Sequence, residues 1–135
     1  MTYKSQLGKL GEDIACKYLV NKGYKIIDRN FRKPWGEIDI ITKAPNKTLV
    51  FVEVKTIRQN SGLTKEEQLQ PEDQLTKSKL QKLKRTASLY AGHCQDLIKD
   101  NKGWKIDLIA ITLSEPNKLT IEEKSCLVRH YENIA

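Results

Sequence analysis

The sequence predicts one α/β domain spanning residues 1–135, with a mixed central sheet flanked by helices. Its 135 residues are a usual length for a single domain. A chain of this length buries roughly two-thirds of its unfolded surface and needs neither a disulfide nor a structural metal to hold a core. Hydrophobic residues recur with helical spacing in two segments and favour strands in the others. The resulting order, α-β-β-β-α-β-β, is typical of a sheet with helices packed against it.

The first half of the chain is expected to form one helix and three strands. Its first segment carries a hydrophobic stripe with spacings of three and four, made of Leu7, Leu10, Ile14 and Tyr18. This spacing predicts a helix over 5–21, ended by Gly23. Strands are expected over 24–30, 37–41 and 49–55, separated by turn residues at 34–36 and 45–47.

The second half begins with a polar stretch over 59–73, which is predicted to be a mobile loop. A second helix is expected from Pro71 or Glu72 to Tyr90, because proline suits the first turn of a helix. An aliphatic strand is predicted over 104–113. A turn at 116–117 and short strands over 119–121 and 126–128 complete the chain.

The charge balance favours a polyanionic partner. Lys and Arg number 24 and Asp and Glu 17, which gives a net charge of +7 and suits nucleic acid. The three cysteines include no CxxC pair, so a reducing compartment, the cytoplasm, is expected. No hydrophobic run is long enough to span a membrane and no signal peptide is recognisable. The second helix uses its apolar face for the core, which argues against binding at a membrane surface.

Two acidic residues stand on neighbouring strands that are otherwise hydrophobic. A hairpin centred on Asn46 places Asp39 opposite Glu53 and Ile41 opposite Phe51. Directly opposed like charges are destabilising, so a proton or a divalent cation is expected between the two carboxylates. The other face of the hairpin would then be aliphatic throughout, comprising Ile38, Ile40, Val50, Val52 and Val54.

This arrangement contains the parts needed for metal-assisted phosphodiester hydrolysis. All-oxygen ligands suit Mg²⁺ or Mn²⁺. Lys55 lies on the same face as Glu53, where its ammonium could hold a water or stabilise charge on a phosphate. The alternative is an exposed strand face with a Glu37–Lys55 salt bridge that contributes little.

Lys79 on the second helix falls within the hydrophobic arc when the residues are placed 100° apart. A lysine on a core face is costly unless it is paired, so Lys79 is a candidate to reach the acidic residues. The alternative is that its side chain extends to solvent. The helix also carries basic residues outside this arc that could bind phosphates, namely Lys77, Lys82, Lys84 and Arg85.

Glu12 on the first helix lies on the side that carries Gly8 and Ala15, whose small size leaves room for another element. It could therefore be a third carboxylate at the metal site, or a plain surface glutamate. His93 and His130 have no metal-ligand spacing around them and are expected to be structural.

The motifs together resemble the YraN family of small, uncharacterised bacterial proteins. In chain order they are Gly8-x-x-Gly11-Glu12, Arg29-Asn30-Phe31-Arg32, Gly36-Glu37-Ile38-Asp39-Ile40-Ile41, Phe51-Val52-Glu53-Val54-Lys55, Lys79 with Leu83, and Ile106-Asp107-Leu108-Ile109. The likeness extends over residues 8–111. That family is similar to the PD-(D/E)xK nuclease superfamily, particularly the archaeal Holliday-junction resolvases.

The resemblance implies a restriction-endonuclease-like αβββαβ core and a metal site that holds Mg²⁺ or Mn²⁺. It implies Asp39, Glu53 and the main-chain carbonyl of Val54 as metal ligands, with Lys55 as the catalytic lysine. It adds Glu12 as a further acid and possible metal ligand. The resemblance also matches Lys79 to a family lysine on the second core helix, where superfamily members often carry an active-site residue.

Further roles follow from the same resemblance. Glu37 would support the site and Asp107 would be structural. The family usually has an arginine two residues after the catalytic lysine, but here Ile57 occupies that position and Arg58 follows it. Contacts with nucleic acid are expected from Arg32 and Arg58 together with the four basic residues of the second helix. By analogy with junction resolvases, which cut two strands, a homodimer is expected.

The sequence therefore predicts a metal-dependent nuclease that acts on DNA, including branched or repair intermediates. The alternative is a module that keeps the fold and binds nucleic acid without cutting it. Cleavage that depends on Glu53 would distinguish the two.

Overall fold

A computed structural model describes residues 3–58, 75–97, 103–113 and 126–135. In chain order the elements are α1 (Tyr3–Asn21), β1 (Lys25–Lys33), β2 (Gly36–Lys43), β3 (Leu49–Arg58), α3 (Lys77–His93), a 3₁₀ turn (Gln95–Leu97), β4 (Trp104–Leu113) and β5 (Cys126–Tyr131). The predicted mixed α/β class and its element order are thereby confirmed, and the architecture is compatible with a restriction-endonuclease-like core.

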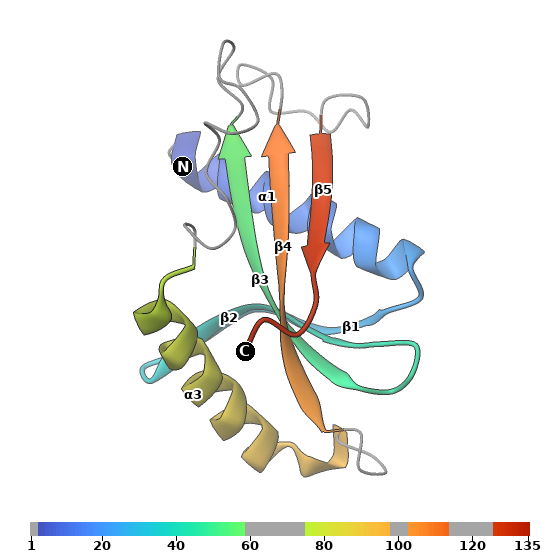
Figure 1. Ribbon diagram of the computed structural model, residues 1–135, viewed down its shortest axis with the longest axis vertical. Coiled ribbons are helices and arrows are strands. Elements are labelled where there is room, and N and C mark those ends of the chain that lie inside the picture. Colours follow the sequence, from blue (N-terminus) through green and yellow to red (C-terminus); the bar gives the residue numbers. More distant parts are fainter. Residues whose placement is uncertain (1–2, 59–74, 98–102, 114–125) are drawn as a thin grey trace.

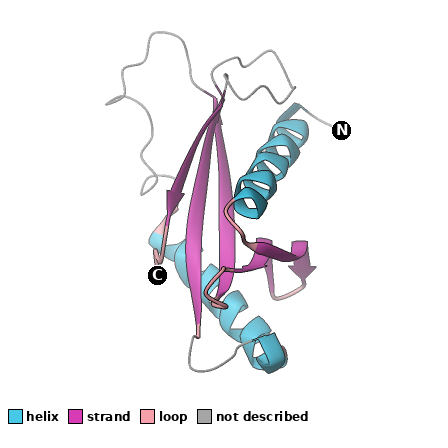
Figure 2. Cartoon of the chain, turned by 90° about the vertical axis from the view of Figure 1, so that its right-hand side faces the viewer, coloured by secondary structure: helices cyan, strands magenta, loops and turns pink. Residues whose placement is uncertain are grey.

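The five strands form one mixed sheet in the order β1-β2-β3-β4-β5. β3 and β4 are parallel over their whole length, and the other neighbouring pairs are antiparallel. A parallel pair needs a long crossover, which here contains α3. In Figure 1, α1 passes behind β3, β4 and β5, while α3 runs along the lower part of the sheet. Figure 2, turned by 90°, shows α1 beside these strands.

Each helix covers its own hydrophobic cluster on the sheet. The α1 cluster includes Leu10, Ile14, Ala15 and Leu19 of the helix with Ile40, Val50, Val52 and Val54 of the strands. The α3 cluster includes Leu83, Ala87, Tyr90 and Ala91 of the helix with Ile41, Leu49, Phe51 and Ile106. Successive residues of β3 thus alternate between the two faces, as the period of two requires.

The predicted hairpin register is confirmed up to Ile40, but the expected face of Ile38 is wrong. β2 and β3 pair Ile41 with Phe51 and Ile40 with Val52, and the described pairing ends there. Ile38 packs in the α3 cluster, not with Ile40 in the α1 cluster. The hairpin of β1 and β2 turns away from β3 beyond this point, so the simple alternation of faces does not continue through Asp39 (Figure 1).

One of the two small residues expected to let α1 approach the sheet, Gly8, does not do so. A Cβ on Gly8 would meet nothing, whereas one on Gly11 would collide with the side chain of Thr56 on β3. Gly11 therefore sets the close crossing of α1 over β3. Ala15 is fully buried in this interface, as predicted.

The second helix begins later than predicted. α3 starts at Lys77, and Thr76 is its N-cap, with Oγ1 accepting a hydrogen bond from the Lys79 N–H at 3.2 Å. A start at Pro71 or Glu72 is therefore wrong for this helix, because Thr76 has an extended backbone that is typical of a cap.

Other boundaries differ in smaller ways. β1 extends to Lys33 and β5 extends to Tyr131, both beyond the predicted ends, while β4 matches its predicted span. The predicted loop over 59–73, the turn at 116–117 and the strand over 119–121 lie outside the described residues.

Candidate functional site

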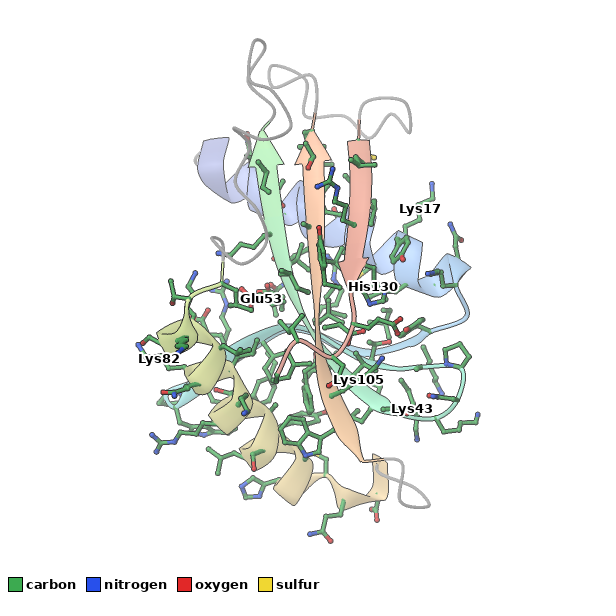
Figure 3. All side chains as sticks on the ribbon, in the orientation of Figure 1. Lys17, Lys43, Glu53, Lys82, Lys105 and His130 are labelled. Carbon is green, nitrogen blue, oxygen red and sulfur yellow. The ribbon has the colours of Figure 1, made fainter. Side chains whose placement is uncertain are left out.

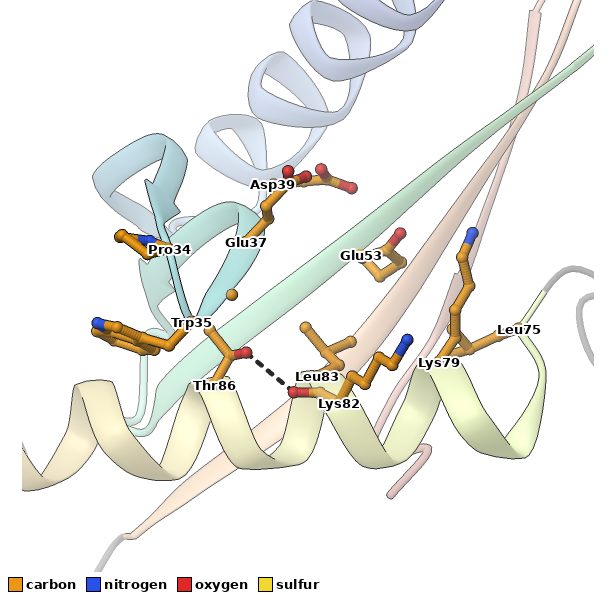
Figure 4. A pocket seen from close by; sticks show the side chains of 11 residues that line it. Pro34, Trp35, Glu37, Asp39, Glu53, Leu75, Lys79, Lys82, Leu83 and Thr86 are labelled. Atoms are coloured by element: carbon orange, nitrogen blue, oxygen red, sulfur yellow. Dashed lines mark hydrogen bonds between the residues drawn. The ribbon is translucent and has the colours of Figure 1, made fainter.

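A cavity of about 420 Å³ opens between α3 and the first part of β2. Its walls come from the β1–β2 turn, from β2 and β3, and from α3 and the residue before its cap; they comprise Pro34, Trp35, Gly36, Glu37, Asp39, Glu53, Leu75, Lys79, Lys82, Leu83 and Thr86. Figure 4 shows Asp39 and Glu53 on the strand side of this cavity and Lys79 and Lys82 on the helix side. The structure thus brings together five of the residues singled out from the sequence, since Glu37 also lines the cavity.

Asp39 lies where the ladder between β2 and β3 stops. Its Oδ2 accepts a hydrogen bond from the backbone N–H of Val54 at 2.8 Å. A continued ladder would have paired Val54 with Ile38, so the Asp39 carboxylate takes the place of a backbone acceptor. Burial raises the pKa of Asp39, and the Val54 hydrogen bond and the Lys55 ammonium oppose this effect.

Glu53 follows Val52 on β3 and faces the same cavity. Burial, followed by the neighbouring Asp39 carboxylate, raises the pKa of Glu53 to about 7. Lys55 and Lys79 act in the opposite direction, and Glu12 adds to the increase. Asp39 is therefore close enough to Glu53 for its charge to make ionisation of Glu53 less favourable.

Glu12 reaches the same acidic residues from α1. Its Oε1 is buried and has no hydrogen-bond partner within the part of the chain that the structure describes. Burial raises the pKa of Glu12, the charge of Asp39 raises it further, and Arg29 and Arg32 lower it. Glu12 is thus not a plain surface glutamate, and its orphaned oxygen is the kind of buried group that needs a partner. We call Glu12, Asp39 and Glu53 the acidic triad.

Lys55 and Lys79 approach each other from β3 and α3. A hydrogen bond with Lys79, followed by burial, lowers the pKa of Lys55, while Glu53 and Asp39 raise it. Lys79 is exposed to solvent and lines the cavity. The side chain of Lys79 is thus exposed, and its charge is close enough to Glu53 to lower the pKa of that carboxyl.

The other predicted residues are distributed as follows. Glu37 is exposed at the cavity wall, and Arg32 is exposed on β1, directly paired with it in the sheet. Lys77, Lys82, Lys84 and Arg85 are all exposed on α3, but only Lys82 lines the cavity. Arg58 is the last residue of β3, and its side chain lies outside the described atoms.

A second charged group lies on β4, on β5 and just after β5, and none of its residues lines the cavity; Figure 3 labels two of them, Lys105 and His130. Asp107 is fully buried and its Oδ2 lies 2.7 Å from His130 Nε2. Its Oδ1 accepts a hydrogen bond from the Asn133 N–H at 2.9 Å. Lys105 Nζ lies 3.7 Å from Asp107 and 2.9 Å from Glu132. We call Asp107, His130, Lys105 and Glu132 the Asp107 cluster.

Three members of the Asp107 cluster could hold a metal ion. One ligand atom from each of Asp107, His130 and Glu132 lies within 4.8 Å of the other two, and no other trio of potential ligands among the described residues is this close. Lys105 already forms ion pairs with both carboxylates, however, and a bound cation would have to displace its ammonium. The structural role expected for Asp107 agrees with these contacts.

The motif-based likeness can now be compared with known proteins. The model of the family described as "Uncharacterised protein family UPF0102" matches residues 11–111. This chain belongs to UPF0102. The resemblance to the YraN family is thereby confirmed, since both names denote the same family. The family description assigns no activity, so membership by itself does not identify a reaction.

Relatives of this UPF0102 chain cover most of its length. A UPF0102 protein of Fervidobacterium nodosum is 35% identical over 126 residues, which are 93% of this chain and 79% of the relative. One from Thermodesulfovibrio yellowstonii is 42% identical and covers 78% of this chain and 85% of the relative. One from Caldanaerobacter subterraneus is 38% identical and covers 89% of each.

Among solved structures, SfsA of Pyrococcus furiosus in complex with Ca²⁺ is similar at a TM-score of 0.38 and 15% identity. The likeness covers 96% of this UPF0102 chain but only 63% of SfsA. A similarity this weak establishes neither the fold nor the function. None of the described helices combines the length and the hydropathy that crossing a membrane requires.

Two features of the UPF0102 chain were not predicted from its sequence as functional. Trp35 lines the cavity, and the only signal for it was an aromatic residue within turn residues 34–36. The grouping of the Asp107 cluster is also visible only in the structure. The sequence does contain one signal of a buried, paired charge, which is an aspartate between Ile106 and Leu108 in an aliphatic strand.

Proposed function

We propose that this protein is a metal-dependent nuclease that hydrolyses phosphodiester bonds in DNA. The observation that carries the proposal is the proximity of two half-buried carboxylates, Asp39 and Glu53, to the Lys55–Lys79 pair. Perturbed carboxylates beside lysines in a cavity are typical of catalytic sites. The Asp107 cluster lacks this character, because its buried carboxylate is hydrogen-bonded and compensated.

The residues of the acidic triad fit a divalent cation. Glu12 Oε1 is a buried oxygen with no partner among the described residues, and burial raises the pKa of all three carboxyls. A nearby positive charge would relieve both the desolvation and the mutual repulsion. Hard oxygen donors favour Mg²⁺ or Mn²⁺.

We assign the metal ligands to Asp39 and Glu53, with Glu12 as a further carboxylate. The main-chain carbonyl of Val54 remains a proposed ligand as well. In a strand, the N–H and C=O of one residue point to the same side, and the Val54 N–H points to Asp39. When bound there, a divalent cation supplies Lewis acidity toward a phosphate oxygen and lowers the pKa of a coordinated water.

The lysines act on the attacking water and on the phosphate. Lys55 Nζ holds the water and, in its deprotonated fraction, accepts a proton from it, a role favoured by the lowered pKa that Lys79 produces. Lys79 donates hydrogen bonds to the developing charge on the phosphate. Glu37, beside the cavity, raises the pKa of Asp39, and its negative charge would help to attract a cation to the site.

Nucleic acid is held by the basic surface around the cavity. We propose that Lys82 contacts the phosphate nearest the acidic triad and that Lys77, Lys84 and Arg85 extend this contact along α3. Arg32, which lowers the pKa of Asp39 and Glu12 from the β1 side, would contact the other side of the strand. Arg58 at the end of β3 would do so too. Such contacts predict an affinity that falls steeply with salt.

The test is cleavage of labelled linear duplex, single-stranded, flap and four-way-junction DNA, and one RNA, in Mg²⁺ or Mn²⁺. Wild-type protein and Glu53→Ala are purified identically, because a contaminating nuclease would be present in both preparations. We expect the wild type to cut at least one DNA and Glu53→Ala to cut none while binding DNA as well as the wild type.

A matched control is Glu132→Ala, which removes an exposed glutamate from the Asp107 cluster. It should leave cleavage unchanged. Equal cleavage by wild type and Glu53→Ala would refute the site. Binding without cleavage by either protein would favour the nucleic-acid-binding module instead.

A further inference from the structure

We infer that Trp35, at the tip of the β1–β2 hairpin, stacks on an unpaired base of the nucleic acid whose backbone lies in the acidic cavity. This inference rests on the proposed function and narrows its substrate to DNA with single-stranded character beside the scissile phosphate. Four observations carry it: the exposure of Trp35, its support by neighbouring residues, its place in the cavity and the charges that share that cavity.

Trp35 is an exposed aromatic residue in the wall of a polar cavity. Its relative exposure is 39%, although tryptophan is usually well buried. The other large hydrophobic residues that are exposed in the described part of the chain, Val20, Leu89 and Leu127, do not line the cavity. The second tryptophan, Trp104, is half-buried against Phe51, with ring centroids 5.6 Å apart. Among the exposed large hydrophobic side chains of the described residues, Trp35 is thus the one that lines this cavity.

The hairpin tip holds Trp35 firmly. Pro34 restricts the backbone of the turn. A Cβ on Gly36 would collide with Thr86, so the start of β2 lies directly against α3. Phe31 packs edge-on against Trp35 at 5.7 Å and against Tyr90 of α3 at 5.1 Å. A ring that is already positioned loses little conformational entropy when it binds a ligand.

Trp35 lines the same cavity as Asp39 and Glu53 of the acidic triad and as two lysines of α3, Lys79 and Lys82. Trp35 lies in the turn directly before β2 and four residues from Asp39, which is about 13 Å of chain at the rise of a β-strand. Figure 4 shows Trp35 at one end of the cavity wall, with Glu53, Lys79 and Lys82 toward the other. A single strand could therefore place one phosphate at the acidic triad and a base a few nucleotides away on the indole.

The combination of an aromatic ring with nearby lysines matches the chemistry of single-stranded nucleic acid. Bases stack on aromatic side chains with little sequence preference, while a positive groove holds the backbone. In a continuous duplex the faces of the bases are covered by their neighbours. The indole would then have access to a base only at an end, a flap, a junction or a gap.

The test uses intrinsic fluorescence, because the chain has two tryptophans. Trp104→Phe leaves Trp35 as the single reporter and retains an aromatic ring against Phe51. The protein is titrated in EDTA, where no cleavage occurs, with a short single-stranded DNA, an abasic strand of equal length and a blunt duplex. We expect strong quenching by the single strand and little by the abasic strand or the duplex.

A binding measurement with labelled DNA accompanies the titration. Trp35→Ala should weaken binding of the single strand by about tenfold to a hundredfold and leave binding of the abasic strand unchanged. Trp35→Tyr should restore most of the affinity, and Trp35→Leu, which is apolar but not aromatic, should not. If Trp104→Phe does not fold, the quenching is taken as the difference between wild type and Trp35→Phe.

The results separate this inference from the proposed function. Equal quenching by the base-containing and abasic strands, or unchanged affinity of Trp35→Ala, would overturn stacking even if Glu53-dependent cleavage is observed. Binding that requires Trp35 without cleavage of any substrate would support stacking and refute the nuclease. Quenching by the duplex equal to that by the single strand would overturn the assignment to unpaired bases.

Discussion

The acidic triad and the Asp107 cluster both contain carboxylates from strands of the same sheet, but they differ in what those carboxylates contact. Asp107 accepts a backbone N–H, lies 2.7 Å from His130 and is compensated by Lys105. In the acidic triad, Glu12 has an oxygen without a partner among the described residues, and burial raises the pKa of all three carboxyls.

We base the distinction between a structural charge and the proposed functional site on this difference. A fully hydrogen-bonded carboxylate fixes the elements around it, here the end of the chain against β4. Carboxylates that repel one another in a desolvated cavity destabilise the fold, and such groups concentrate at sites that bind a cation or a substrate. If the distance between three potential ligands were the only criterion, the Asp107 cluster would be the candidate metal site.

The largest expected contrast concerns the free energy of unfolding. Asp107→Ala should destabilise the protein by about 3–5 kcal/mol, because it leaves buried donors and a lysine without their acceptor. Urea unfolding measures this loss. Glu132→Gln, which changes a glutamate whose side chain is 59% exposed, serves as the control and should cost less than about 1 kcal/mol. An Asp107→Ala protein as stable as the wild type would remove the distinction between the two groups.

Glu53→Gln should have the opposite effect on the free energy of unfolding: it should stabilise the protein. The folded-state pKa of Glu53 is about 7 against an ordinary value of 4.5, so between these values the folded protein binds more protons than the unfolded chain. The contribution of Glu53 to stability therefore falls as pH rises from about 4.5 to about 7. Glu53→Gln removes this dependence and should stabilise the protein at pH 8 by at most about 3 kcal/mol.

The measurement is the urea midpoint of wild type and Glu53→Gln across this pH range. The two proteins should converge below about pH 4.5, where Glu53 is protonated in both the folded and the unfolded state. A Glu53→Gln protein that is less stable than the wild type at pH 8 would mean that Glu53 is compensated in the way that Asp107 is.

Stabilisation by Mn²⁺ tests whether a cation binds at the acidic triad or at the Asp107 cluster. At a Mn²⁺ concentration ten times its Kd, the wild type should gain about 1.4 kcal/mol, visible as a rise of a few degrees in Tm. Asp39→Asn should abolish this rise, and Glu132→Gln should retain it. The reverse pattern would place the cation on the Asp107 cluster and refute the assignment to the acidic triad.

The smallest expected effect concerns a single lysine at the cavity. Lys82→Gln should reduce the slope of log affinity against log salt by about 0.7 for single-stranded DNA, which corresponds to one lost phosphate contact. Lys17→Gln, on the exposed surface of α1, is the matched control and should leave the slope unchanged (Figure 3). Equal slopes for wild type and Lys82→Gln would exclude Lys82 from the phosphate path.

Local patterns in the sequence determined most of the fold. The alternation of residues around Asn46 was sufficient for the pairing of Ile41 with Phe51, because side chains of a strand point to alternate faces and one register buries the hydrophobic set. The helical stripe of α1 and the aliphatic run of β4 were equally local signals. The same alternation predicted that Asp39 and Glu53 lie together, and the ordered motifs were sufficient to identify the family.

Only the tertiary structure decided how the strands bend and which distant groups meet. Ile38 packs toward α3 because β2 leaves β3 at Asp39, and Gly11, not Gly8, sets the crossing of α1 over β3. The contact of Lys55 with Lys79 and the pairing of Asp107 with His130 join residues from separate elements. Such contacts depend on packing between segments that are far apart in the chain, and the periodicity of one segment contains no information about its partner.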